Sequence, residues 1–298
     1  MPWIQLQIPA DPDNADQLED LLMELGADAV SMEDAADQPL YEPDPGTTPL
    51  WHETRVTGLF DSDRNIEQLC AEISSRWHQE TQQSLSDIEV TLVEDKDWER
   101  VWMDDFTPLR FGERLWIVPS WHEAPDPKGA NLLLDPGLAF GTGTHPTTAL
   151  CLEWLDGHPV ADKQVIDYGC GSGILGLAAL LLGANHVIAV DTDPQALEAS
   201  RENARRNEVD DDRLDLYLPA DEPDAVAQVL LANILAQPLI GLAPHLAARV
   251  VTGGDIVLSG ILSNQARDVM EAYEPWFIMD EPEQRDEWVR LTGRRRDR

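Results

Sequence analysis

Lysine, cysteine and long apolar stretches are all scarce in this chain of 298 residues. Lys and Arg together number 21 against 56 Asp and Glu, so the formal net charge is −35. A chain with this balance repels phosphate, which argues against a nucleic-acid-binding protein. Because the acids are spread along the whole sequence, we interpret them as a surface adapted to high salt rather than as the mark of a basic substrate.

The cysteines are few, odd in number and far apart: Cys70, Cys151 and Cys170. This spacing excludes a disulfide framework and offers no metal-ligand pattern. No apolar run approaches the length of a membrane span, and the opening residues, MPWIQLQIPADPDN, lack the basic-then-apolar pattern of a signal peptide. We therefore expect no metal and no membrane contact, and a cytoplasmic location.

Glycine, in contrast, is concentrated where the chain reads VIDYGCGSGILGLAALLLGANHVIAVD, residues 165–191. An apolar run ends at Asp167, a glycine turn follows, and then come an apolar helix, a second β-branched run and Asp191. The turn contains Gly169, Gly171 and Gly173. Glycines let a ligand approach the backbone, and an acid about twenty residues after the turn can accept the ribose hydroxyls. The pattern predicts a nucleotide-binding βαβ unit.

These residues alone are compatible with more than one cofactor. The letters GSGILG fit the dinucleotide fingerprint, so a nicotinamide-dependent oxidoreductase is one alternative. However, Asp167 stands directly before the loop, where it would repel a pyrophosphate and favour the sulfonium and ammonium groups of S-adenosylmethionine. We therefore favour S-adenosylmethionine. A binding module that uses this cofactor without catalysis, such as a ribosome-assembly factor, is a further alternative.

Residues 1–94 are expected to form a domain of their own. Apolar periodicity predicts strands at 3–8, 29–32, 55–60 and 88–93, and helices at 14–25 and 65–78. The order βαββαβ is that of the split βαβ, ferredoxin-like plan. Because no catalytic constellation is present, we interpret this domain as one that recognises the substrate. The charged, tryptophan-rich residues 95–109 are expected to form a linker helix.

Residues 110–298 alternate strands and helices, which predicts an α/β domain with a doubly wound, mostly parallel sheet. After strands at 114–119 and 131–134, strands are expected at 165–167, 187–191, 214–218, 228–233, 255–259, 275–279 and 287–292. Helices are expected at 174–182, 194–207, 236–249 and 263–273. The last two strands leave no room for a helix between them, so they should form an antiparallel edge hairpin.

Two further segments read LDPGLAFGTGTHPTT, residues 134–148, and LANILAQPL, residues 231–239. Together with DYGCGSG they resemble the bacterial PrmA family, the methyltransferases of large-subunit ribosomal protein eleven, and the resemblance runs the length of the chain. It implies a class I, Rossmann-like methyltransferase fold and S-adenosylmethionine as cofactor. The cofactor contacts of the family fall on Thr148, Gly169, Asp191 and Asn233, and all four match. The unusually acidic composition is the departure from the family.

The resemblance implies methyl transfer to lysine ε-amines of the ribosomal protein. The N-terminal α-amine of that protein and other substrate proteins are the alternatives. We expect the enzyme to be a monomer. Asn233, at a strand end, is the expected catalytic residue, because its side chain can accept an N–H from the amine and aim the lone pair at the methyl. Thr148 is expected in a loop over the methionine end of the cofactor. We interpret His145 as structural, and no general base is assigned.

Overall fold

The computed structural model describes residues 2–35, 53–85, 88–93, 106–135 and 145–297. The chain divides into two compact units, residues 1–105 and 106–298. Most of the expected linker helix lies outside the described residues, and its described end is not helical, because Leu109 already begins a strand. Within the described residues, no helix has the length and apolar character needed to cross a membrane.

The first unit has the element order predicted from the sequence. Its elements are β1 (Trp3–Ala10), α1 (Ala15–Glu24), β2 (Ala29–Asp34), β3 (Thr54–Asp61), α2 (Ile66–Thr81) and β4 (Glu89–Val93). The strands form one sheet in the order β2-β3-β1-β4, with all neighbours antiparallel. The parallel strands β1 and β2 therefore flank β3, which is the split βαβ arrangement.

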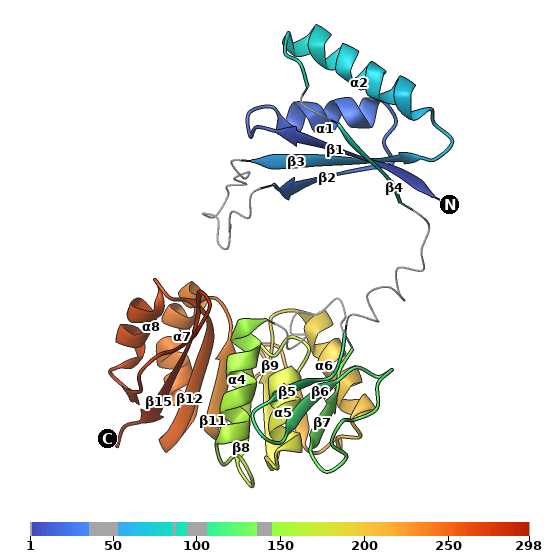
Figure 1. Cartoon of the computed structure of the whole chain (residues 1–298). Helices are drawn as coiled ribbons and strands as arrows, with labels where there is room; N and C mark the ends of the chain where they lie inside the picture. Colours follow the sequence, from blue (N-terminus) through green and yellow to red (C-terminus); the bar gives the residue numbers. More distant parts are fainter. Residues whose placement is uncertain (1, 36–52, 86–87, 94–105, 136–144, 298) are drawn as a thin grey trace. The chain divides into compact units, whose positions relative to one another are not determined.

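One face of this sheet is covered by α1 and α2 (Figure 1). Alternate residues of β1, Ile4, Leu6 and Ile8, are fully buried on that face, as the period of a strand requires. They pack with apolar residues of both helices, Trp77 of α2 among them, into a core that belongs to this unit alone.

The second unit contains the remaining elements. A three-stranded sheet is formed by β5 (Leu109–Phe111), β6 (Leu115–Val118) and β7 (Ala130–Leu133). The large sheet and its helices comprise α4 (Pro146–Gly157), β8 (Gln164–Tyr168), α5 (Ile174–Leu181), β9 (His186–Val190), α6 (Pro194–Arg206), β10 (Leu214–Tyr217), β11 (Ala227–Asn233), α7 (Ala236–Ala248), β12 (Val250–Leu262), α8 (Ala266–Tyr273), β13 (Phe277–Met279), β14 (Glu283–Arg285) and β15 (Trp288–Arg295).

The large sheet runs in the order β10-β9-β8-β11-β12-β15-β13, and β14 also pairs with β15. The five strands from β10 to β12 are parallel, whereas β15 is antiparallel to both β12 and β13. The doubly wound sheet and its antiparallel edge, both predicted from the sequence, are confirmed.

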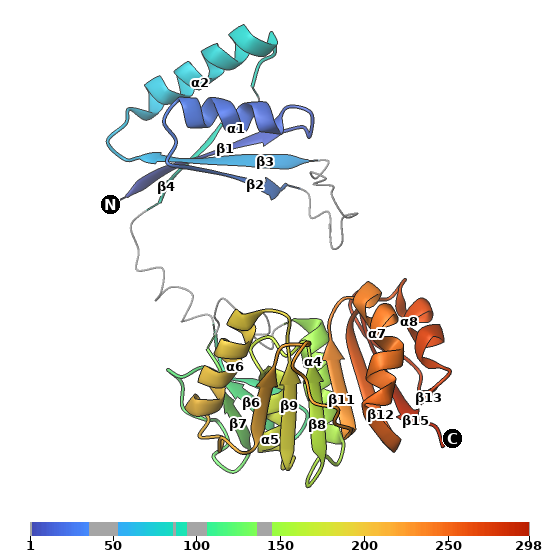
Figure 2. The same ribbon diagram turned by 180° about the vertical axis from the view of Figure 1, so that it is seen from behind.

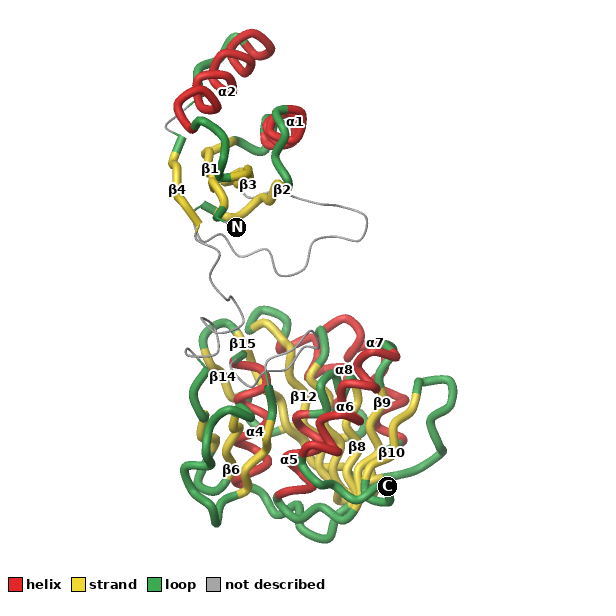
Figure 3. Tube along the Cα trace, turned by 90° about the vertical axis from the view of Figure 1, so that its right-hand side faces the viewer, coloured by secondary structure: helices red, strands yellow, loops and turns green. Residues whose placement is uncertain are grey.

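Helices cover both faces of this sheet, because every central strand is apolar on both sides. One residue set of the strands, such as Val165 and Val187, packs with α4, α5 and α6. The alternate set, such as Ile166 and Ile188, packs with α7 and α8. The view from behind shows α7 and α8 in front of the strands (Figure 2), and the side view shows the layers (Figure 3).

The structure differs from the predicted elements around β12. The sequence predicts a strand over 255–259 only. Instead β12 runs through the glycines, with Gly253 at a φ of +72° and a register shift against β11. This is a bulge, in which extra residues are absorbed without ending the strand.

Candidate active site

The polar residues predicted for the site converge where the order of the sheet reverses. From β8 the chain adds β9 and β10 on one side, and then crosses to add β11 and β12 on the other. The carboxyl ends of β8 and β11 are therefore neighbours, although the two strands are far apart in the sequence. Such a switch point leaves a crevice in which ligands of doubly wound folds bind.

The three predicted glycines form the loop between β8 and α5. Gly169, Gly171 and Gly173 have φ angles of +79°, +55° and +79°, a region that side chains disfavour. A Cβ at Gly169 would lie 2.2 Å from Ile234 Cγ2, and one at Gly173 would lie 2.8 Å from Ser200 Oγ. The loop thus requires glycine for its backbone conformation and for its close neighbours.

Asp191 follows β9 and faces this loop. Its Oδ2 accepts the Gly171 N–H at 2.9 Å, and its Oδ1 accepts the Asp193 N–H at 3.0 Å. The carboxylate is therefore held beside the glycine turn by two backbone donors. This agrees with the twenty-residue separation that predicted a ribose contact, and it leaves lone pairs for ligand hydroxyls.

Asp167 lies in β8 with 1 % of its surface exposed. Its Oδ2 accepts the N–H of Gly176 in α5 at 2.8 Å, and its buried Oδ1 has no hydrogen-bond partner among the described residues. Burial raises the pKa of this carboxyl to about 7, with the Gly176 N–H opposing the rise and Asp191 adding to it. A buried carboxylate in this state is stabilised by an added donor or a nearby cation.

Asn233 and Thr148 come together from elements that are 85 residues apart in the sequence. Asn233 ends β11, and its Nδ2 donates to Thr148 Oγ1 at 3.2 Å. Thr148 is 2 % exposed. One N–H of the Asn233 amide is thereby committed to the threonine, which fixes the plane of the amide.

The expectation that Thr148 belongs to a loop is wrong. Pro146 begins α4, so Thr147 and Thr148 lie in its first turn, and the segment 136–144 is outside the described residues. Proline at the first helical position favours a helix start, a signal that outweighs the neighbouring glycines. His145 is the N-cap, with Nδ1 accepting the Thr147 N–H at 3.4 Å. Its predicted structural role is consistent with this position.

Helix α6 contributes two polar residues that sequence reasoning missed. Ser200 Oγ donates to the Gly171 carbonyl at 2.9 Å, and Asn203 Nδ2 donates to the Ser172 carbonyl at 2.9 Å. The two are three residues apart, on one face of the helix. Their polarity on a helix face turned toward the glycine loop was the available signal.

A third missed residue, Ser259, lies on β12 opposite Asn233. Its Oγ donates to the Thr147 carbonyl at 3.0 Å, and the side chain is fully buried. Because it ends a predicted parallel strand at the edge that carries Asn233, its position was predictable from the strand order.

The residues at this crevice fit S-adenosylmethionine. The glycine loop gives close access to the backbone, and Asp191 offers acceptors for ribose hydroxyls. Asp167, with a buried oxygen that has no hydrogen-bond partner among the described residues, suits a cationic ligand better than a pyrophosphate. Gly169, Gly171 and Gly173 would line the approach.

Comparison with known proteins decides the family. Residues 2–296 match the family model described as ribosomal protein L11 methyltransferase (PrmA). The chain belongs to the PrmA family. As a member, it is an S-adenosylmethionine-dependent methyltransferase, and the family resemblance inferred from its motifs is confirmed.

PrmA relatives cover the whole chain. The ribosomal protein L11 methyltransferase of Marinobacter nauticus is 82 % identical over 100 % of both chains. That of Chromohalobacter salexigens is 54 % identical over 99 % of both. Among solved structures, the ribosomal protein L11 methylase of Lactobacillus delbrueckii subsp. bulgaricus is 32 % identical with a TM-score of 0.59, over 64 % of this chain and 100 % of that chain.

Proposed function

We propose that this enzyme transfers methyl groups from S-adenosylmethionine to amines of ribosomal protein L11. Lysine ε-amines are the substrate groups we favour, with the N-terminal α-amine as the alternative of the same chemistry. The observation that carries the proposal is the Asn233 amide at the switch point, committed to Thr148 through one N–H.

Asn233 supplies the orientation that this chemistry requires. With its Nδ2 donating to Thr148, its Oδ1 accepts an N–H of the incoming amine and aims the nitrogen lone pair along the line of displacement. When bound, the cofactor supplies a methyl group made electrophilic by the sulfonium. Alignment then provides much of the acceleration, because in-line displacement needs the reacting atoms in near-attack geometry.

The other contacts hold the donor in place. Asp191 and the glycine loop take the adenosine end, and Ser200 and Asn203 stiffen that loop from α6. The amine must be neutral to react, and apolar surroundings lower the pKa of an ammonium. His145 is engaged as the cap of α4, so we assign it no proton transfer.

The first unit is the part we propose recognises the ribosomal protein. It has its own core, and the described site residues lie in the second unit. We further place the enzyme in the cytoplasm as a monomer that makes no direct contact with nucleic acid, since a net charge of −35 opposes phosphate.

The test is methyl transfer to the purified substrate. The enzyme is incubated in high salt with isotope-labelled S-adenosylmethionine and unmethylated L11, and the modified positions are mapped by mass spectrometry. Label on lysine ε-amines supports the proposal. Label on the α-amine alone would show that the N-terminal α-amine is the substrate group instead. No label on L11, together with label on other ribosomal proteins in a parallel incubation with the unmethylated ribosomal protein mixture, would overturn the substrate assignment.

A further inference from the structure

Three segments of the second unit meet around Thr148: the first turn of α4, the end of β11 and the part of β12 that pairs with it. Asn233 and Ser259 are register partners on the two adjacent parallel strands. Ser259 is fully buried, and its hydroxyl points out of the sheet to α4 rather than to another strand. The hydrogen bond to the helix carbonyl offsets the cost of burying this hydroxyl, so the contact ties β12 to α4.

The hydroxyl of Ser259 reaches Thr148 through a rigid unit. It donates to the Thr147 carbonyl at 3.0 Å, and that carbonyl shares one planar peptide group with the Thr148 nitrogen. Holding the carbonyl therefore holds the plane from which Thr148 extends. Thr148 Oγ1 in turn accepts from Asn233 Nδ2 at 3.2 Å, so the contacts close a ring through both strands and the helix.

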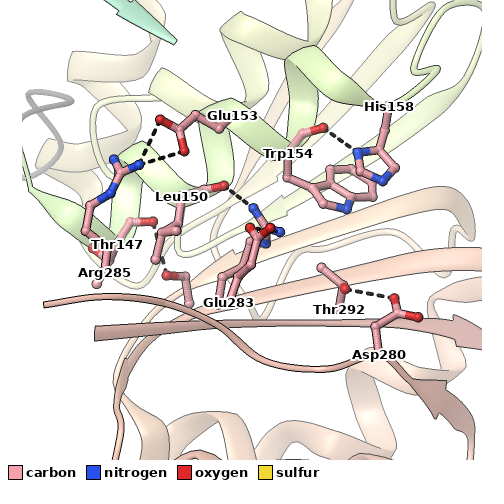
Figure 4. Close-up of polar contacts among 11 residues, drawn as sticks. Thr147, Leu150, Glu153, Trp154, His158, Asp280, Glu283, Arg285 and Thr292 are labelled. Atoms are coloured by element: carbon pink, nitrogen blue, oxygen red, sulfur yellow. Dashed lines mark hydrogen bonds and ion pairs between the residues drawn. The ribbon is translucent and has the colours of Figure 1, made fainter. Parts of the chain in front are cut away.

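The rest of α4 is fastened to the sheet by separate contacts. Arg290 of β15, only 7 % exposed, donates to the Leu150 carbonyl at 2.7 Å. Further along the helix, Arg285 of β14 binds both carboxylate oxygens of Glu153 at 2.9 and 2.8 Å (Figure 4). Loss of the Ser259 hydroxyl should therefore free the first turn of α4 while the helix stays in place.

We propose that Ser259 is a positioning residue for methyl transfer: through the Thr147 peptide group it sets Thr148, and Thr148 sets the amide of Asn233. This inference rests on the proposed function. Ser259 itself touches neither the substrate nor the donor.

The first test compares Ser259→Ala with a matched control. In Thr292→Val, a β15 hydroxyl that donates to Asp280 at 2.8 Å is removed, remote from the first turn of α4 (Figure 4). For Ser259→Ala we expect kcat to fall about tenfold, because a small misplacement of aligned reacting groups lowers the rate strongly. The KM for the donor should change by a smaller factor than kcat, because Asp191 and the glycine loop, which hold the adenosine end, are untouched. Thr292→Val should keep the wild-type kcat.

A double-mutant cycle tests the route through Thr148. If Ser259 acts through Thr148, adding Ser259→Ala to Thr148→Val should lower kcat by less than about twofold further. If the fall in kcat of the double variant equals the product of the falls in the two single variants, Ser259 acts by another route and the inference is overturned.

Hydrogen exchange supplies a readout without cofactor or activity. In Ser259→Ala, amides in the first turns of α4 should exchange faster than in the wild type and in Thr292→Val, with the end of the helix unchanged. If the wild type methylates no substrate, the proposed function fails. If it methylates L11 and Ser259→Ala matches Thr292→Val in both exchange and kcat, the inference about Ser259 fails alone.

Discussion

Asp167 shows how a single residue can serve the fold and the site at once. Its carboxyl accepts the Gly176 N–H at the start of α5 and is almost fully buried, and its second oxygen has no partner among the described residues. Burial without a counter-charge favours the protonated form, which is why the pKa rises to about 7.

This raised pKa predicts a pH-dependent gain of stability for Asp167→Asn. Between about pH 4 and pH 7 the folded wild type keeps a proton that the unfolded chain has lost, so its stability falls as pH rises through that window. The amide has no such titration and still accepts from Gly176. Urea denaturation in high salt should therefore show the variant gaining, relative to the wild type, up to about 4 kcal/mol from pH 4 to pH 7.

Asp211→Asn is the control, because it makes the same substitution at an exposed residue. A difference between Asp167→Asn and wild type that stays constant with pH would contradict the burial argument.

Residues at strand ends were predictable, whereas their supports were not. Asp191 and Asn233 follow apolar strands directly, so the strand pattern alone places them at the carboxyl edge. The sequence could have indicated the positions of Asn203 and Ser259, on a polar helix face and at a strand end, but not that their side chains bind main-chain carbonyls. Such a partner has no sequence signature, and it is defined only when the helices and strands have docked.

At the scale of elements, β12 and the segment after β11 fit closely together. Gly260 has a φ of +82°, and a Cβ there would lie 2.3 Å from the Ile234 carbonyl oxygen. The obstacle is backbone, which cannot rotate away. The same Ile234 lies against Gly169 of the glycine loop, so a displacement of Ile234 would affect both β12 and the glycine loop.

We predict that Gly260→Ala lowers the free energy of unfolding by about 2 kcal/mol or more, from the disfavoured φ and the clash. The matched variant is Gly241→Ala, in the exposed interior of α7 with no atom within 4 Å of the new Cβ. That change should raise stability by about 0.5–1 kcal/mol, because alanine favours helix. Equal effects of the two variants in chemical denaturation would refute this assignment.

Helix α6 should control donor binding through the glycine loop. Removing either loop contact, in Ser200→Ala or Asn203→Ala, should weaken S-adenosylmethionine binding by about tenfold, as expected for the loss of one buried hydrogen bond. Isothermal titration calorimetry gives the Kd. Arg201→Ala changes only an exposed pair with Glu198 on the same helix and should bind normally. Unchanged affinity in both loop variants would show that α6 does not support the loop.

Most elements were predictable from periodicity, and the exceptions have local causes. The bulge in β12 was hidden by two adjacent glycines, and helix α4 was not predicted at all, because its start follows a glycine-rich stretch. β14 is three residues long, too short for a strand period to appear. Each exception depends on tertiary pairing or on helix capping rather than on propensity.

At the scale of the whole molecule, the charge of −35 should make stability depend on salt. Like charges on a folded surface repel each other, and salt shortens the range of that repulsion. We predict that Tm rises by about 5 °C or more between 0.1 and 1 M KCl. Sucrose at equal osmolality is the control for exclusion effects. A Tm that is insensitive to KCl, or that rises equally in sucrose, would contradict the interpretation of the acids as salt adaptation.

The doubly wound fold could be predicted because the elements follow one another in the order that this fold requires. Strand, glycine loop, helix and acid define one βαβ unit, and the alternating elements after it define a parallel sheet. How the switch point joins Thr148 to Asn233, 85 residues later, could not be predicted without the family resemblance. The spacing of residues in the sequence does not predict a side-chain contact between elements so far apart in the chain.

The decisive measurement is single-turnover methyl transfer to L11 by the wild type and by Asn233→Ala, with donor affinity measured in parallel. We predict that the alanine variant still binds S-adenosylmethionine within about tenfold of the wild type, but transfers methyl about 100-fold more slowly, because the amine is no longer aligned. Transfer at the wild-type rate by Asn233→Ala would contradict the role given to this residue and to the contacts that hold it.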